Sequence, residues 1–171
     1  LQAVVDAPRA PALRLSPKRD MAAMLQTPAL PSIAQVAAPE LKLAGLRISP
    51  RTFSDSRFSF ASQLWLISTA DGAQRQISGL PQPLSVASLA WSPDQKYYAF
   101  NQVEPATGVN TLWLVDVASH RARLLTRESL NSVSGRGWRW MPDSRALLVN
   151  LRAAGEGGLP GVDGSPTGPN V

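Results

Sequence analysis

Short apolar runs separated by turn-forming residues occupy the chain from residue 63 to residue 152. Each run has the length that is typical of a strand, and glycine, proline, asparagine, aspartate or serine residues bound it. The pattern therefore predicts an almost entirely β structure here. The expected strands cover residues 63–68, 73–77, 86–91, 96–102, 111–116, 121–126, 136–140 and 145–151.

One hairpin pattern occurs twice along these strands. The sequence WSPD starts at Trp91 and an apolar run follows it, and the related sequence WMPD starts at Trp140 and leads into a second apolar run. In each copy an aromatic residue ends one strand. Proline then presets φ near about −65°, and the aspartate can cap the turn through its carboxylate. Two copies of one hairpin indicate a repeated structural unit.

A second marker recurs with nearly the same spacing. The offset is 49 residues from Trp91 to Trp140, and it is 48 residues from Trp65 to Trp113, each of which lies within a Leu-Trp-Leu sequence. A period near about 50 residues with four short strands per unit is typical of β-propeller blades. We expect Trp65 and Trp113 to pack between stacked blades, because large aromatic residues in strands usually fill cores.

The chain divides into four expected segments. Residues 1–27 form an N-terminal arm and a partial first hairpin, 28–62 an insertion with a short helix and a loop, 63–154 two propeller blades, and 155–171 a loop rich in glycine and proline. A closed ring needs at least four blades, or roughly 200 residues. We therefore predict an all-β, incomplete propeller of about two to three four-stranded antiparallel blades, and a piece of a longer protein.

Composition narrows the classes of function. The net charge is +5, but the lysines and arginines are scattered and form no run of the kind that binds nucleic acid. The absence of cysteine excludes disulfides and thiol catalysis. No apolar run approaches the roughly 20 residues of a membrane span, and the start does not resemble a signal peptide. We expect neither a nucleic-acid partner nor a membrane span.

The residues of this segment do not form a catalytic set. No Gly-x-Ser-x-Gly elbow occurs, and the single histidine, His120, falls in a tight hairpin turn. The four aspartates Asp71, Asp94, Asp116 and Asp143 lie in or beside turns, where capping is the default role. We expect no catalytic residue, no metal site and no cofactor in the segment.

Three pieces of sequence carry a resemblance to a known family. The WSPD hairpins together with the Leu-Trp-Leu strands are similar to blade repeats of propellers in the prolyl oligopeptidase family of serine peptidases. The stretch LAGLRISP at residues 43–50, with Ser56 and Arg57, resembles the entry to the first complete blade in the glutamyl-endopeptidase-like branch of that family. Residues 31–34 and 166–171 share this resemblance.

The resemblance implies a two-domain enzyme in which a propeller caps a C-terminal α/β-hydrolase domain that carries the Ser, Asp and His triad. It further implies cleavage of peptide substrates after acidic residues, and a periplasmic or otherwise exported location, with the cytoplasm as an alternative. An acidic side chain would need a charge-assisted partner, for which Arg47 and Arg57 are the candidate substrate-binding residues. Both occur in the stretch that is least like a blade.

Two other functions remain open from the sequence. The propeller could be a non-enzymatic module that binds a protein partner through its blade loops. It could also belong to a dipeptidyl- or acylaminoacyl-peptidase, which shares the fold and reads a free or blocked N-terminus. The oligomeric state and the number of blades are not defined by the sequence.

Repeat architecture leads to a first prediction about stability. Each blade buries its faces on its neighbours, so an incomplete array exposes apolar sheet. Residues 1–171 expressed alone should therefore aggregate or bind a hydrophobic dye, which light scattering and dye fluorescence would measure. A cooperative melt of a monomer without dye binding would contradict this expectation.

Overall fold

The strands and the single helix are seen in a computed structural model that describes residues 9–31, 33–57 and 59–153. The expected loop at 155–171 and the first eight residues of the arm lie outside the described residues. The strands are β1 (Ala12–Leu15), β2 (Met21–Gln26), β3 (Leu41–Leu43), β4 (Leu46–Ser49), β5 (Ser54–Asp55), β6 (Gln63–Ser68), β7 (Gln74–Gln76), β8 (Val86–Trp91), β9 (Tyr97–Glu104), β10 (Val109–Asp116), β11 (Arg121–Leu124), β12 (Trp138–Trp140) and β13 (Leu147–Val149), and the helix is α2 (Ile33–Val36).

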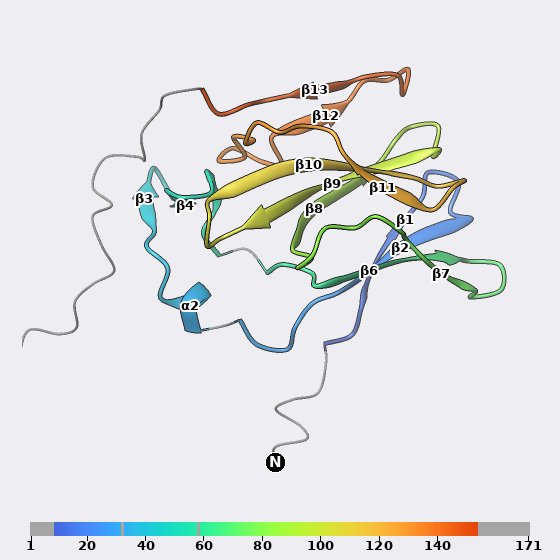
Figure 1. Ribbon diagram of the computed structural model, residues 1–171, viewed down its shortest axis with the longest axis horizontal. Coiled ribbons are helices and arrows are strands. Elements are labelled where there is room, and N and C mark those ends of the chain that lie inside the picture. Colours follow the sequence, from blue (N-terminus) through green and yellow to red (C-terminus); the bar gives the residue numbers. More distant parts are fainter. Residues whose placement is uncertain (1–8, 32, 58, 154–171) are drawn as a thin grey trace, which may run out of the picture.

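Two four-stranded antiparallel sheets form the body of the structure. The first has the order β1-β2-β6-β7 and the second the order β8-β9-β10-β11, so each sheet follows the chain from one edge strand to the other. Figure 1 shows the two sheets stacked, with the β12–β13 hairpin above the second sheet. Four consecutive antiparallel strands stacked on a similar unit are the blade arrangement of a propeller. The predicted fold class, an all-β incomplete propeller, is confirmed.

The hairpin that opens each unit has the same backbone shape in all three copies. Arg19, Gln95 and Ser144 occupy equivalent turn positions and have φ values of 63°, 56° and 61°. Ser92 accepts a hydrogen bond at its carbonyl from Gln95 N at 2.9 Å, and the Ser16 carbonyl accepts the matching bond from Arg19 N at 2.9 Å. The β12–β13 hairpin is therefore the start of a third blade.

Alternation along the strands decides which side chains lie between the sheets. Leu64 and Leu66 of β6 face the second sheet, where Tyr98, Phe100 and Val115 cover them in one buried cluster. Residues one position away along a strand point to the opposite face. Ala99, Leu112 and Leu114 accordingly join Trp138 in a second cluster, between the second sheet and the third hairpin.

The two Leu-Trp-Leu tryptophans have different surroundings. Trp113 packs against the first cluster and stacks on Phe100, with 6.4 Å between ring centroids and 19° between ring planes. The expected packing role is confirmed for this residue. Trp65 lies between Leu64 and Leu66 on its strand and so faces away from the second sheet, on a partly exposed side of the first. In a ring, this side would face the preceding blade.

The tryptophan that begins the WSPD and WMPD sequences also joins neighbouring sheets. The Trp91 indole Nε1 donates to the carbonyl of Arg14 in the first sheet at 2.8 Å. One blade further on, Trp140 Nε1 donates to the carbonyl of Ala90 at 3.2 Å. Arg14 and Ala90 are the next-to-last residues of β1 and β8, the first strands of their blades. Equivalent indole bonds therefore link the second blade to the first and the third hairpin to the second blade.

The opening turns are linked to each other as well. The Gln95 side chain accepts a hydrogen bond from Lys18 N at 3.1 Å and donates to the Asp20 carboxylate at 3.0 Å. In the next pair of turns, Asp94 N donates to Ser144 Oγ at 3.0 Å. In both pairs, the turn residue with positive φ, Gln95 or Ser144, therefore contacts the opening turn of the preceding blade.

The insertion lies inside the first blade, between β2 and β6. Antiparallel pairing from Met21 with Ser68 to Gln26 with Gln63 places the hairpin of residues 12–26 in the same sheet as β6 and β7. The sequence division had grouped β6 and β7 with the strands that follow them. The first blade instead takes its two opening strands from the N-terminal segment, because the pairing spans a long stretch of chain that a local pattern does not reveal.

The insertion contains one turn of helix and a small sheet of order β3-β4-β5. The expected short helix is confirmed as α2. Residues 41–49 form the β3–β4 hairpin, because Ala44 and Gly45 adopt φ values of 48° and 84°. The rest of the insertion, expected to be a loop, contains the short strand β5. In the described part of the chain, no helix reaches the length and hydropathy of a membrane span.

Contacts with later blades anchor the insertion. Phe53 is buried, and its carbonyl accepts a hydrogen bond from Ser132 N at 2.8 Å on the link that leads to β12. Arg51 donates to the carbonyl of Ala106 at 3.2 Å, in the loop between β9 and β10. Figure 1 shows α2, β3 and β4 at one end of the stacked sheets. The insertion therefore connects the first blade to the second and to the start of the third.

The indole bond between blades can be tested by replacing Trp91 with phenylalanine. Trp91→Phe keeps an aromatic ring but removes the hydrogen bond to the Arg14 carbonyl, so we expect the free energy of unfolding to fall by about 0.5–1.5 kcal/mol. Denaturant unfolding of the full-length parent would measure the shift. Trp65→Phe is the control, because Trp65 lies on the partly exposed face of the first sheet. An equal or larger effect of the control would contradict the role of the bond.

Candidate functional site

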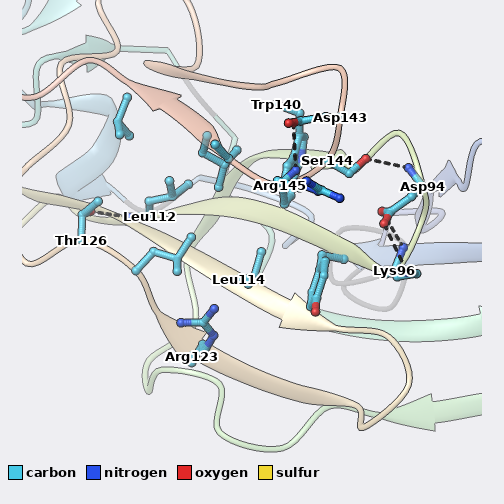
Figure 2. A pocket seen from close by; sticks show the side chains of 15 residues that line it. Asp94, Lys96, Leu112, Leu114, Arg123, Thr126, Trp140, Asp143, Ser144 and Arg145 are labelled. Atoms are coloured by element: carbon cyan, nitrogen blue, oxygen red, sulfur yellow. Dashed lines mark hydrogen bonds and ion pairs between the residues drawn. The ribbon is translucent and has the colours of Figure 1, made fainter.

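A hollow of about 770 Å³ lies between the second blade and the third hairpin. Figure 2 shows Leu112 and Leu114 beneath it and Trp140 on the opposite wall. Charged residues form the rim, where Asp94 lies close to Ser144 and Lys96. A hollow with apolar residues at its base and charged residues at its edge is expected where one blade packs against the next.

The repeat identifies what this hollow corresponds to in the preceding interface. There, Trp113 and Val115 from the third strand of the second blade cover Leu64 and Leu66. Leu112 and Leu114 of the second blade correspond to Leu64 and Leu66 of the first. Within the described residues, however, the third blade has only its first two strands, so it has no third strand to cover them. The hollow is therefore the position of an outer blade strand, and its chemistry does not point to catalysis.

The turn residues considered in the sequence have structural roles. Asp71, Asp94 and Asp143 each accept a hydrogen bond from the backbone N–H two residues ahead, at 3.1, 3.2 and 3.0 Å. Asp116 accepts one from Ser119 N at 2.8 Å. His120 adopts φ 53° where the first blade has Gly72, and its carbonyl accepts a bond from Ser78 N at 2.9 Å. The capping interpretation of all four aspartates is confirmed.

The described residues contain no group of three or more histidine, aspartate or glutamate side chains that could hold a metal ion. Among the described residues, His120 lies in the turn between β10 and β11, and its imidazole is not placed as a base beside a serine hydroxyl.

The insertion brings Arg47 and Arg57 together around one carboxylate. Arg47 lies on β4 and its guanidinium donates to Glu40 Oε1, while Arg57 follows β5 and its Nε lies 3.6 Å from Glu40 Oε2. Ser56 Oγ donates to the same carboxylate at 3.0 Å, and Lys42 Nζ lies 3.8 Å from it. The two candidate arginines therefore meet at the insertion, where Glu40 already partners both.

The environment of Glu40 favours its ionised form. Desolvation alone would raise the pKa of the Glu40 carboxyl, since only 23% of its side chain is exposed. The hydrogen bond from Ser56 and the charges of Arg47 and Arg57 act in the opposite direction and hold the pKa below its ordinary value. Glu40 is thus a stable anion that fixes the positions of the cations around it.

Three smaller hollows follow one another along the insertion. The first, of about 220 Å³, reaches from Ser88 on β8 to Asp55 and Arg136. The second, of about 250 Å³, shares Asp55 and Val133 with the first and adds Arg47 and Arg57. The third, of about 460 Å³, also includes Arg57 and extends past Glu40 to α2. Neighbouring hollows share lining residues, and we call the three hollows the trough; three arginines, Arg47, Arg57 and Arg136, line it.

Sequence reasoning did not identify Arg136. It lies in the sequence Ser-Gly-Arg-Gly before Trp138, and the pattern of the strands gave no reason to separate it from other exposed arginines. The two flanking glycines were the available signal, because glycine permits backbone conformations that fix a loop in an unusual shape. Gly135 and Gly137 do adopt positive φ values, of 136° and 75°.

The fold defines the class of protein as an open segment of a β-propeller, and comparison with known proteins narrows it. No family model matches the chain. The chain is 31% identical, over its full length, to a protein of Oryza sativa subsp. japonica named "Probable glutamyl endopeptidase, chloroplastic". It is 34% identical, over 98% of its length, to a protein of Arabidopsis thaliana with the same name.

The chain spans about a fifth of these relatives, 19% of the first and 18% of the second. Two solved structures align with the chain at low sequence identity. The propeller domain of the Trilobed protease from Pyrococcus furiosus aligns with 83% of this chain and 33% of its own, at 15% identity and a TM-score of 0.44. An acylaminoacyl peptidase aligns with 83% of this chain and 17% of its own, at 16% identity and a TM-score of 0.45.

The resemblance stated from the sequence is confirmed by these relatives. The chain is homologous, along its whole length, to proteins named as glutamyl endopeptidases. The region of identity includes the insertion as well as the blades.

The ionised state of Glu40 leads to a prediction about pH. Because folding depresses its pKa, Glu40 stabilises the insertion above its unfolded pKa, and this contribution disappears as the pH falls through the lower folded pKa. Glu40→Gln should therefore weaken the insertion near neutral pH and make its stability less dependent on pH. Hydrogen exchange of residues 41–57 in the full-length parent, corrected for intrinsic rates, would measure both effects.

Glu128→Gln is the matched control for that measurement, since Glu128 is an exposed residue on the link between β11 and β12. It should leave exchange in residues 41–57 unchanged. The role of Glu40 would be refuted if protection of the insertion depended on pH equally in Glu40→Gln and in the wild type.

Proposed function

We propose that this chain is the N-terminal propeller segment of a serine peptidase and caps a C-terminal α/β-hydrolase domain of the same parent. The observation that carries the proposal is homology along the whole chain to proteins named as glutamyl endopeptidases that are about five times longer. The turn positions of His120 and the four aspartates agree with it, because catalysis then depends on residues elsewhere in the parent.

A propeller in this position filters peptide substrates. A ring over an active site admits unfolded peptides, excludes folded proteins by size and shelters the reaction from bulk water. The connected contacts of the insertion support this role, since they tie the first three blades together through Phe53, Arg51 and Ser132. A rigid ring can then discriminate by size.

The parent cleaves peptides after acidic residues in this proposal, and Arg47 and Arg57 contact the substrate. Their side chains are 40% and 67% exposed, and both line the second hollow. Arg57 has the longer contact with Glu40, at 3.6 Å, so a substrate carboxylate competes more easily for it than for Arg47. Guanidinium groups suit this task because they bind carboxylates in a bidentate way.

The parent acts in an exported or organellar compartment in this proposal. The names of both relatives include the word chloroplastic, which supports an organellar setting for proteins of this kind. The periplasm is the corresponding exported compartment in a bacterial parent, and the cytoplasm is the alternative that fractionation of cells would distinguish.

The full-length parent provides the test of this function. Its sequence beyond Val171 should contain a Gly-x-Ser-x-Gly elbow, and it should cleave peptides with Glu or Asp before the scissile bond in preference to those with Ala or Pro. A propeller-binding module would lack the elbow and the activity. A dipeptidyl- or acylaminoacyl-peptidase would depend on the state of the peptide N-terminus.

The arginine assignment is tested separately in the same enzyme. Arg47→Ala and Arg57→Ala should each lower kcat/KM for acidic substrates by about tenfold, because each removes a charge-assisted hydrogen bond. Arg75→Ala on β7 is the control, since Arg75 is exposed and lies away from the trough. Unchanged turnover of acidic peptides in both variants would exclude these two residues from substrate binding.

A further inference from the structure

The first hollow of the trough contains an arginine whose surroundings differ from those of Arg47 and Arg57. Arg136 lies on the link before β12 and lines a space of about 220 Å³ with Ala87 and Ser88 of β8 and Asn101 of β9. Among the described residues it forms no ion pair with a carboxylate, whereas the other two share Glu40. Its charge is therefore available to a ligand.

A buried tryptophan orients the Arg136 side chain. The guanidinium carbon lies 5.2 Å from the centroid of the Trp138 ring, a cation–π contact that restricts the side chain without neutralising it. Trp138 is only 5% exposed, and its indole Nε1 donates to Asn101 Oδ1 at 2.5 Å. The ring that supports Arg136 is thus itself held in place by a buried hydrogen bond.

A buried polar network holds the backbone of the same residue. Asn101 Nδ2 donates to the carbonyl of Arg136 at 3.1 Å and to Asn110 Oδ1 at 3.0 Å. Asn110 Nδ2 in turn donates to Ser132 Oγ at 2.7 Å. Buried amides are costly unless they are hydrogen-bonded, and a satisfied network makes its surroundings rigid. Here the rigid element is the loop that carries Arg136.

The glycine after Arg136 completes this loop. Gly137 has φ 75°, and a Cβ at this position would lie 2.7 Å from the carbonyl oxygen of Asn131. Its own carbonyl accepts a hydrogen bond from Asn150 N at 2.8 Å. Only glycine fits this close approach, so the packing of Gly137 and the bond from Asn101 to the Arg136 carbonyl together fix the backbone that follows Arg136.

We infer that Arg136 binds the carboxylate of an acidic side chain of a bound peptide within this hollow. The inference rests on the proposed peptidase function and adds a subsite to it. A preorganised guanidinium with no ion pair loses little freedom when it binds a carboxylate, and it can do so with two parallel hydrogen bonds. The hollow is smaller than the roughly 300–1,000 Å³ of a typical ligand pocket, which suits one side chain.

The position of the hollow agrees with access by a peptide. Ala87 and Ser88 belong to the first strand of the second blade, and first strands line the central channel in a propeller. Asp55 lies on the wall that this hollow shares with the next one. Its negative charge opposes a carboxylate in either hollow, so Asp55→Asn should strengthen binding of an acidic peptide.

The test measures peptide binding directly in the full-length parent, treated with diisopropyl fluorophosphate to stop turnover. The probes are acetyl-Glu-Ala-Glu-amide (the Glu peptide) and acetyl-Gln-Ala-Glu-amide (the Gln peptide), which share the C-terminal Glu assigned to Arg47 and Arg57 and differ only in the second carboxylate. The readout is the Kd from calorimetry. Arg136→Gln should weaken binding of the Glu peptide by about ten- to hundredfold, the range expected for a hydrogen-bonded charge, and leave binding of the Gln peptide unchanged.

Arg139→Gln is the matched control, because Arg139 is an exposed arginine on β12 that does not line the hollow. Arg136→Lys keeps the charge but not the planar fork, so it should lose less affinity than Arg136→Gln. Equal binding of the Glu peptide by Arg136→Gln and Arg139→Gln would overturn the inference. If Arg136→Gln did not fold, wild-type affinity in a folded Arg136→Lys variant together with wild-type affinity in Arg136→Ala would overturn it.

The binding readout separates this inference from the proposed function. A parent that hydrolyses no peptide but binds the Glu peptide through Arg136 would refute the peptidase and retain the subsite. A parent that cleaves after acidic residues with full affinity in Arg136→Gln would retain the peptidase and refute the subsite.

Discussion

Burial of one blade face beneath the next is the interaction on which this structure depends. The second sheet contributes apolar residues to a buried cluster on each of its faces, and stacking removes both the Leu64–Leu66 face of the first sheet and the Leu112–Leu114 face of the second from water. The indole bonds from Trp91 and Trp140 fix the register of this stacking, because each donor reaches one defined carbonyl in the preceding blade. Hydrophobic burial drives the stacking, and the directional bonds determine the alignment.

The insertion adds contacts that the repeat does not provide. It leaves the first blade between β2 and β6, returns to it, and on the way packs Phe53 against the link to the third blade. Its own small sheet is held by Glu40, which collects cations from both sides of the β3–β4 hairpin. A segment with little core of its own thus gains its order from electrostatics and from docking on other blades.

The arginines of the trough illustrate how surroundings distinguish residues of one type. Arg47 and Arg57 are positioned by a carboxylate, which also competes with any anionic ligand. Arg136 is positioned by a ring and by a buried amide network, neither of which carries a compensating charge. A guanidinium that is held in place but keeps its charge unpaired is ready to bind a carboxylate.

The sequence by itself determined the strands, the opening hairpins and the family resemblance, because alternation, turn residues and repeat spacing are local properties that act over a few residues. It placed the capping aspartates correctly for the same reason. Only the tertiary structure decided that β6 pairs with β2 across the insertion, that Glu40 joins Arg47 to Arg57, and that Asn101 supports Arg136. These contacts join residues far apart in the chain, and their partners become neighbours only when the blades stack.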